Sequence, residues 1–277
     1  MSALPPPLPV RARRPGAVPL RVCLVGGYIS YRALFNWIRP ALYIPTMLLG
    51  PVFQILFFTY LGRFVQLQDD AFFVVGNSVQ IAAMSGVYAG VMAIANERQF
   101  QTLSALLASP ANRAALFVGR ALPVVANGLL VSAWGFGVSA LLLHFRPAGS
   151  SLGPLALAVL VSVLSCAAWG LALGSLGLRF RDVFVIANVA YYVMWILCGV
   201  NLPASALPGA LVWIGRVLPM THGIEAARRV AGGGGLGSAW MPLLVELGIG
   251  LGWAEAALLL FKLFEAEGKH RATLEQG

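Results

Sequence analysis

The sequence predicts an all-α polytopic membrane protein, and three observations support this class. Of the 277 residues, 59% are hydrophobic and only 10% are charged, and the mean hydropathy is +0.81. A soluble domain carries roughly 25% charged residues, so this chain cannot cover itself with a wetted surface. Several segments exceed the roughly 20 apolar residues that cross about 30 Å of hydrocarbon as a helix. Segments of alternating polarity, which an outer-membrane barrel requires, are absent.

The two ends of the chain are polar and flank one predicted membrane domain. Residues 1–19 are rich in Pro and Arg and are expected to form a disordered cytoplasmic tail. Residues 20–264 are expected to form a single transmembrane domain. Residues 265–277 carry charged side chains and are expected to form a cytoplasmic C-terminal tail.

Residues 20–39 are predicted to form an amphipathic helix that lies in the plane of the membrane interface. Arg21, Arg32 and Arg39 are 11 and 7 positions apart. At about 100° per residue they fall within roughly 20° of one another, which places a basic stripe along one helix face. An ordinary first span flanked by arginines is the alternative for this segment.

Six membrane spans are predicted from the long apolar runs. They are expected at residues 41–61, 72–95, 114–143, 152–178, 183–200 and 241–264. The second span is rich in small residues, which let helix backbones approach closely in lipid, so we expect it inside the bundle. Six spans put both termini on one side of the membrane. The basic residues gather on this side, which the positive-inside rule identifies as the cytoplasm, and the predicted location is the cell membrane.

A short polar segment, residues 97–113, separates the second and third spans. It begins with Glu97 and Arg98 and reaches Arg113 after a break at Pro110. Apolar residues recur in it at helical spacing, namely Phe100, Leu103, Leu106 and Leu107. The spacing predicts a short helix with one apolar face, which Glu97 would stabilise at its positive end and Pro110 would stop.

Residues 201–240, between the fifth and sixth spans, interrupt the apolar pattern. Three prolines, Pro203, Pro208 and Pro219, bound two apolar pieces that are too short to cross a membrane. Such pieces are typical of interfacial or re-entrant helices, here on the external side. The segment also carries His222, Glu225 and Arg228, and its arginines oppose the positive-inside rule, so we expect its polar residues to have a local role. A run of glycines at 232–235 is expected to close it flexibly.

Known catalytic motifs are missing from the sequence. There is no GxxxxGK[ST] loop to hold a nucleotide, and neither HExxH nor GxSxG occurs. Cys23, Cys166 and Cys198 have no metal-ligand spacing. A basic and aromatic surface for nucleic acid is absent outside the spans. We therefore expect no active site, no metal, no cofactor bound by this chain and no nucleic-acid partner.

Two carboxylates, Glu246 and Glu255, lie within the sixth predicted span. A charge inside the bilayer is costly, so each is expected to face protein or water. Nine positions apart, they point to opposite helix faces. Glu246 lies closer to the external end, where it could reach the surface or pair with Arg228 or Arg229. Glu255 is deeper and is the better candidate for a functional or dimer-interface group, although hydrogen-bonded structural carboxyls are the alternative for both.

Three motifs resemble the ABC-2 type exporter permeases. Their E-R-x-x-x-T-L-x-x-L-L-x-x-P-x-x-R segment is matched by Glu97, Arg98, Thr102, Leu103, Leu106, Leu107, Pro110 and Arg113. Their R-x-R-D turn after the fourth span is matched by Arg179, Arg181 and Asp182. The segment 202–228, with its three Leu-Pro pairs, is similar to the external segment between the fifth and sixth spans of the family, including its drug-resistance members, among them daunorubicin-resistance permeases.

The resemblance implies a permease subunit without an ATPase of its own. Two copies, or two related chains, would pair in membrane lipid with two separate ABC ATPase subunits, which would hold the ATP and magnesium. Segment 97–113 would be the cytoplasmic coupling helix that docks on the ATPase and, with helix 20–39, switches the dimer between inward-facing and outward-facing states. The implied cargo is amphipathic, and drugs, antibiotics, lipids and glycolipids all remain open.

Two alternatives from other classes stay open at this point. A proton-coupled secondary transporter that uses Glu255 would show inverted repeats and helices broken near the midplane, and the sequence has neither. A membrane scaffold without transport activity would leave the apolar face of segment 97–113 unexplained.

Overall fold

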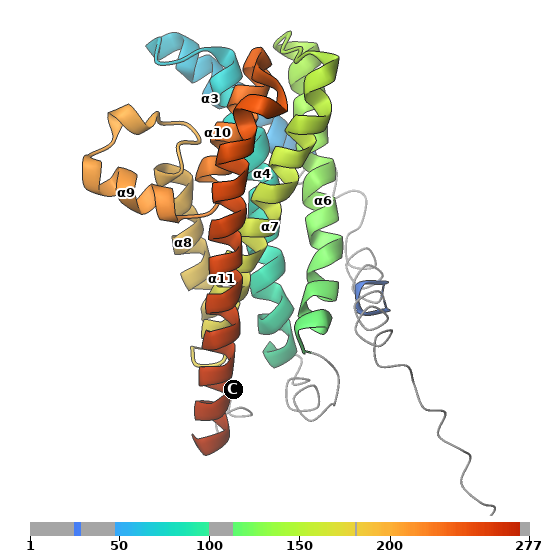
Figure 1. Ribbon diagram of the computed structural model, residues 1–277, viewed down its shortest axis with the longest axis vertical. Helices are drawn as coiled ribbons and strands as arrows, with labels where there is room; N and C mark the ends of the chain where they lie inside the picture. The colour runs from blue at the N-terminus through green and yellow to red at the C-terminus, as the bar shows by residue number, and fades with distance from the viewer. Residues whose placement is uncertain (1–24, 29–47, 100–112, 181, 272–277) are drawn as a thin grey trace, which may run out of the picture.

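The chain is described by a computed structural model that covers residues 25–28, 48–99, 113–180 and 182–271. The regular structure of these residues is helical, and they contain no strand. The all-α class is therefore confirmed for this part of the chain. The longer helices stand side by side as an upright bundle, with most connections gathered at its two ends (Figure 1).

Besides the helical residues 25–28, eight α-helices occur in the described ranges. The long helices are α4 (Asp70–Gln99), α6 (Arg113–Leu142), α7 (Leu152–Leu176) and α11 (Gly235–Arg271). The shorter helices are α3 (Gly50–Val65), α8 (Val183–Leu197), α9 (Gly209–Val217) and α10 (Thr221–Arg229). Single turns complete the fold, namely η2 (Gly149–Ser151), η3 (Ala204–Ala206) and the π-helical η4 (Val230–Gly234).

Four helical segments are long and apolar enough to cross a membrane. They are residues 70–96, 121–142, 149–176 and 221–264, the last of which contains α10, the kink at η4 and most of α11. The apolar helices α3 and α8 have 16 and 15 residues, fewer than the roughly 20 that cross a bilayer without tilt or thinning. The structure thus supports four spans, and the count of six remains a prediction.

The two ends of the bundle differ in what they carry. The upper end in Figure 1 holds the α3–α4 connection, the α6–α7 connection and η4. The lower end holds the last turn of α4, the first turn of α6, the α7–α8 connection and the end of α11. We use "upper end" and "lower end" in this sense below.

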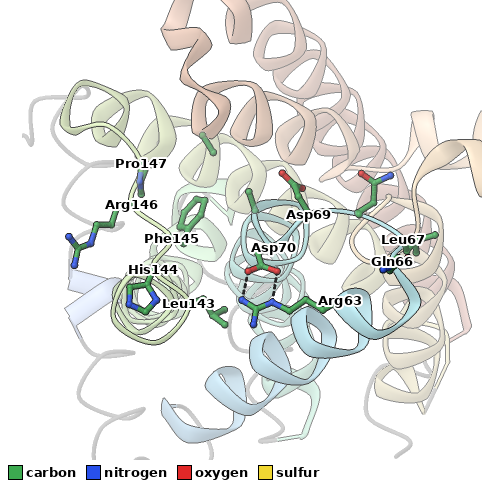
Figure 2. A pocket seen from close by; sticks show the side chains of 13 residues that line it. Arg63, Gln66, Leu67, Asp69, Asp70, Leu143, His144, Phe145, Arg146 and Pro147 are labelled. Atoms are coloured by element: carbon green, nitrogen blue, oxygen red, sulfur yellow. Dashed lines mark hydrogen bonds and ion pairs between the residues drawn. The ribbon is translucent and has the colours of Figure 1, made fainter.

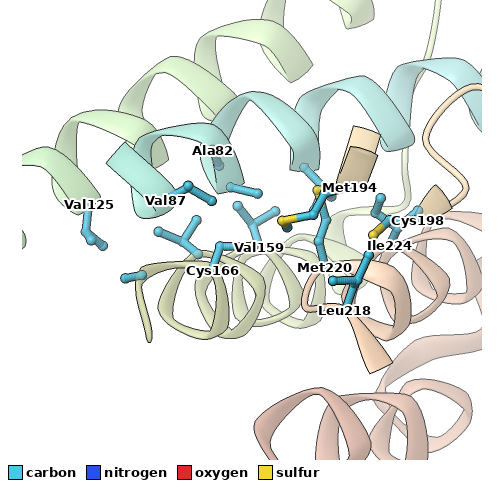
Figure 3. Close-up of a cluster of buried hydrophobic side chains, with 14 of the residues drawn as sticks. Ala82, Val87, Val125, Val159, Cys166, Met194, Cys198, Leu218, Met220 and Ile224 are labelled. Atoms are coloured by element: carbon cyan, nitrogen blue, oxygen red, sulfur yellow. The ribbon is translucent and has the colours of Figure 1, made fainter. Parts of the chain in front are cut away.

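Helix α4 is the centre of the bundle, as the small residues of the second predicted span indicated. It contacts α3, α6, α7, α8 and α10. Its residues Val79, Ala82 and Val87 are fully buried in the main hydrophobic core. Figure 3 shows this core, in which side chains of α4 and α7 meet Met194 of α8 and Met220 just before α10.

Glycines set the distance between α4 and α7. A Cβ atom at Gly170 would lie 2.1 Å from the carbonyl oxygen of Val87, and one at Gly90 would lie 2.4 Å from that of Ala167. Neither backbone oxygen can move without moving its helix. The close approach of the two backbones therefore depends on these glycines, as is usual for helices packed in lipid.

Replacing Gly170 by alanine should destabilise the protein by about 1–3 kcal/mol, because it overpacks a backbone contact. Thermal unfolding of the detergent-purified protein measures this. Gly153, on the same helix, has open space around a Cβ atom, and Gly153→Ala is the matched control. Equal melting temperatures for the two variants would show that the α4–α7 distance does not depend on Gly170.

The glycine run before α11 forms a tight turn. Gly233 and Gly235 have φ angles of 89° and 59°, a region that residues with a side chain rarely adopt. This turn reverses the chain from α10 into α11. Helix α11 therefore begins at Gly235, six residues before the predicted span, and it continues to Arg271, into the segment expected as a tail.

Candidate functional site

The residues between α8 and α11, 198–234, make several hydrogen bonds to the long helices, and we call them the α9–α10 segment. Figure 1 shows α9 beside the bundle and α10 against it, next to α11. Helix α10 contacts α4, α7 and α11. The predicted short helices are therefore present, and one of them is inserted between the long ones.

Glu246 of α11 holds the beginning of α10. Its carboxylate is fully buried and accepts hydrogen bonds from the backbone N–H groups of Met220 and Gly223, at N–O distances of 2.6 and 3.1 Å. The first N–H groups of a helix have no hydrogen-bond partner within the helix and carry partial positive charge. A carboxylate supplies both the missing hydrogen-bond acceptor and a compensating negative charge. The predictions that Glu246 reaches the surface or pairs with Arg228 or Arg229 are wrong, because backbone donors surround it.

Helix α7 packs closely against both partners of this contact. A Cβ atom at Gly223 would lie 1.8 Å from the hydroxyl oxygen of Ser162. On the same helix, the Ser165 hydroxyl donates to the backbone oxygen of Glu246 at 3.3 Å. Helix α7 therefore positions both partners of the Glu246 contact.

Arg228, at the other end of α10, joins three elements at the upper end. Its guanidinium donates to the carbonyl oxygens of Phe72 in α4 at 3.1 Å and of Val200 in the α8–η3 connection at 2.9 Å. The guanidinium carbon also lies 3.5 Å from the centre of the Phe72 ring, within range of a cation–π contact. Gly76 leaves room for this arrangement, since a Cβ there would lie 2.7 Å from Arg228 Nη2.

Arg228→Lys should destabilise the protein by about 2 kcal/mol. A lysine ammonium is not planar and cannot donate to two carbonyl oxygens while it stacks on the Phe72 ring, as the guanidinium does. The more exposed Arg229 pairs with Glu225 on its own helix and donates to Ser238 O, so Arg229→Lys is the matched control. We expect it to change stability by less than about 0.5 kcal/mol. Thermal unfolding compares the two, and an equal loss would show that Arg228 does not hold the elements together.

A chain of side-chain amides lies below Arg228. Gln54 of α3 donates to Asn77 Oδ1 at 2.9 Å and to Gln80 Oε1 at 2.7 Å, both on α4. Asn77 in turn donates to Asn201 Oδ1 at 2.7 Å, and Asn77 and Gln80 are fully buried. This chain ties α3 and α4 to the α9–α10 segment. Sequence reasoning missed it, although amides within apolar spans are the signal that points to such networks.

Hydrogen bonds from α10 and α11 also hold the C-terminal end of α9. The Thr221 hydroxyl donates to Gly215 O at 2.5 Å, and the Trp253 indole of α11 donates to Val217 O at 3.3 Å. His222 Nε2 lies 3.2 Å from Arg216 O. These contacts satisfy carbonyls that the last turn of a helix leaves free.

The remaining predicted residues of this segment have structural or exposed positions. Pro203 and Pro208 directly precede η3 and α9, where their fixed φ suits a helix start, and Pro219 O accepts from the Cys198 thiol at 3.5 Å. Glu225 is exposed, pairs with Arg229 and lies 3.7 Å from His222. Arg228 thus makes local contacts within the bundle, and the roles predicted for the polar residues of 201–240 remain predictions.

An open hollow of about 830 Å³ lies at the upper end, above α4. Figure 2 shows its walls, formed by the α3–α4 connection with the Arg63–Asp70 ion pair and by the α6–α7 connection with His144 and Arg146. Charges of both signs line it.

The lower end carries the ends of the 97–113 segment. Glu97 and Arg98 lie in the last turn of α4, and Arg113 is the first residue of α6. Phe100, Thr102, Leu103, Leu106, Leu107 and Pro110 lie outside the described residues, as do Arg21, Arg32, Arg39 and Arg181. The roles predicted for all of these residues remain predictions.

The α7–α8 connection lies at the same end. Arg179 forms an ion pair with Glu267 of α11 at 3.7 Å, and Asp182 precedes the first residue of α8 and is exposed. The last turn of α4, the first turn of α6, the described residues of the α7–α8 connection and the end of α11 therefore share one end of the bundle.

The described residues contain no group of three or more His, Cys, Asp or Glu side chains that could hold a metal ion. Glu255, the second carboxylate of α11, is exposed on the face opposite Glu246, so the prediction of opposite faces is confirmed.

Four apolar helical segments are long enough to span a membrane, and buried polar residues such as Glu246 and Asn77 lie between them. This arrangement defines an integral membrane protein. The comparison with protein families gives the family. Residues 27–231 match the ABC-2 type transporter domain, which covers 205 of the 277 residues. The chain belongs to the ABC-2 type transporter family and is a membrane transporter subunit of an ABC system. No curated protein matches the sequence.

Proposed function

We propose that this chain is the permease subunit of an ATP-driven exporter, which moves an amphipathic cargo out of the cytoplasm or the inner leaflet by alternating access. The observation that carries the proposal is that the two helix ends flanking residues 100–112, the α7–α8 connection and the end of α11 all lie at the lower end. Together with the family, this favours the lower end as the cytoplasmic docking surface of a separate ABC ATPase. ATP and magnesium would be bound by that subunit and not by this chain.

Helix α4 is the element best placed to transmit movement from the ATPase. Its 30 residues extend over about 45 Å. Segment 97–113 follows its lower end, and Arg228 holds the Phe72 carbonyl near its upper end. A displacement of the coupling helix would therefore shift α4 and, through Arg228 and the amide chain, the α9–α10 segment on the external side. Rigid-body motions of this kind are common in switching proteins.

The complex would contain two permease chains, either identical or related, in the cell membrane with both termini in the cytoplasm. Its six spans would comprise the four long helical segments together with α3 and α8. The drug-export branch remains the favoured subtype because of the Leu-Pro pairs at 202–219.

Glu255→Gln separates this proposal from a proton-coupled carrier. Liposomes that contain the permease and its ATPase, and a fluorescent amphipathic dye as the cargo probe, provide the assay. We expect uptake into inside-out liposomes to require ATP in the wild type and in Glu255→Gln, with less than about a twofold change in rate, because an exposed carboxylate has no step in ATP-driven switching. Uptake that follows an imposed pH gradient without ATP, and that Glu255→Gln abolishes, would establish the carrier instead.

A further inference from the structure

One face of α11 has no partner in the described part of the chain, and a carboxylate lies at its centre. Leu244, Leu251 and Leu259 are exposed on this face, and at 100° per residue they lie within about 40° of Glu255. Glu255 makes no hydrogen bond or ion pair with any described residue. The opposite side of α11, with Glu246 and Ala257, packs against α10 and α7.

A notch in the same face lies one turn above Glu255. Gly248 and Gly252 are four residues apart, and a Cβ atom built on either would meet nothing within 4 Å. At the α4–α7 crossing, a neighbouring backbone fills the space beside the glycines, whereas the space beside Gly248 and Gly252 is open. Glycines spaced in this way inside an apolar helix let a second helix approach its backbone.

Glu255 lies deep enough in the membrane that exposing its carboxylate to lipid would cost free energy. Trp240 and Lys262 are 22 residues apart, which corresponds to about 33 Å of helix and to the thickness of the hydrocarbon layer. Glu255 lies about 10 Å inside the Lys262 end by the same rise per residue. Helical side chains lean toward the N-terminus, here toward the membrane interior, so its carboxylate is directed away from the nearer interface. Such a group is expected to face protein rather than lipid.

We propose that this face of α11 binds a transmembrane helix of a different polypeptide, which carries a lysine or arginine opposite Glu255 and small residues opposite Gly248 and Gly252. A second copy of this chain fits less well. Two copies related by a rotation axis along the membrane normal place identical residues at equal depth, so Glu255 would meet Glu255. Like carboxylates in a medium of low dielectric constant repel each other, and Lys262 is two turns away. The binding test needs neither the ATPase nor transport, so its outcome is independent of the ATPase contact.

The test uses the full-length permease in liposomes and three synthetic transmembrane peptides as probes. The peptides are leucine-rich helices with the same small-residue face and differ at one central position, which is Lys, Leu or Glu. Energy transfer from a labelled permease to a labelled peptide measures binding. We expect the Lys peptide to bind about tenfold more tightly than the Leu peptide, and the Glu peptide more weakly than either.

Variants assign the contact to this face. Glu255→Leu should remove the difference between the Lys and Leu peptides, and Gly252→Ile should weaken the binding of all three. Gly137→Ile is the matched control, since Gly137 is an exposed glycine of α6 with open space around a Cβ atom and no acidic neighbour. Equal binding of the three peptides, binding of none, or no effect of Glu255→Leu would overturn the proposal. Loss of energy transfer between two labelled permeases in Gly252→Ile would also overturn it, in favour of a second copy on this face.

Discussion

Replacing Glu246 by alanine is expected to destabilise the protein more than either Gly170→Ala or Arg228→Lys. The substitution leaves the buried N–H groups of Met220 and Gly223 without acceptors. An unsatisfied buried donor costs about 1–3 kcal/mol, so two of them, together with the space left by the side chain, amount to roughly 4 kcal/mol. The beginning of α10 should then separate from α7 and α11.

Thermal unfolding of detergent-purified protein tests this expectation, and Glu255→Ala is the matched control on the same helix. Glu255 is exposed and has no partner among the described residues, so its removal should leave the melting temperature nearly unchanged. Glu246→Gln should lie between the two variants, because one amide oxygen remains as an acceptor while the amide nitrogen faces a donor. If Glu246→Ala melts together with Glu255→Ala, the carboxylate does not hold α10.

Leu103→Arg is expected to have the largest effect on transport. By the helical spacing of segment 97–113, Leu103 lies on the apolar face that is proposed to contact the ATPase. Burying an unpaired guanidinium in such a contact costs several kcal/mol, and a loss of about 3 kcal/mol corresponds to a roughly hundredfold weaker complex. ATP-driven dye transport should fall accordingly, while the amount of permease in the membrane stays at the wild-type level.

Gln101→Arg is the matched control for this change. Gln101 lies two positions from Leu103, or about 160° away around the helix, so the same charge would face away from the partner. Co-purification of the ATPase and ATP-dependent transport should survive Gln101→Arg. Full transport by Leu103→Arg, or equal losses in the two variants, would remove segment 97–113 as the coupling contact.

The sequence was sufficient for the features that depend on local pattern. Small residues such as Gly76, Gly86 and Gly90 predicted that α4 lies inside the bundle, because small residues let helix backbones approach closely. The prolines at 203, 208 and 219 predicted two short helices, since proline often marks a helix boundary, although Pro123 and Pro242 lie inside α6 and α11. Opposite directions for Glu246 and Glu255 followed from helical geometry alone.

The features that depend on distant contacts could not be predicted. Glu246 meets Met220 and Gly223, which are 26 and 23 positions away, and no periodicity connects a carboxylate to backbone N–H groups at such separations. Sequence reasoning offered Arg228 as a partner because opposite charges attract. The arginine instead contacts carbonyls and a ring 28 to 156 positions away, which only the packing of α4 against α10 brings into reach.

Helix boundaries at the α10–α11 turn were also missed, for a backbone reason. Four consecutive glycines indicate flexibility when read locally. In the fold, Gly233 and Gly235 adopt positive φ and turn the chain within a few residues, which lets α11 start directly behind them.

Site-directed photocrosslinking to the ATPase tests the central claim most directly. A photoreactive phenylalanine derivative would replace Leu106 in one permease and Leu141 in another, and each would be co-expressed with an ABC ATPase from the same gene neighbourhood. Leu141 is 77% exposed near the upper end of α6, so it serves as an accessible position on the opposite side of the membrane. The account predicts a crosslink to the ATPase from position 106 and none from position 141. A crosslink from position 141, or none from position 106 in a complex that hydrolyses ATP, would contradict it.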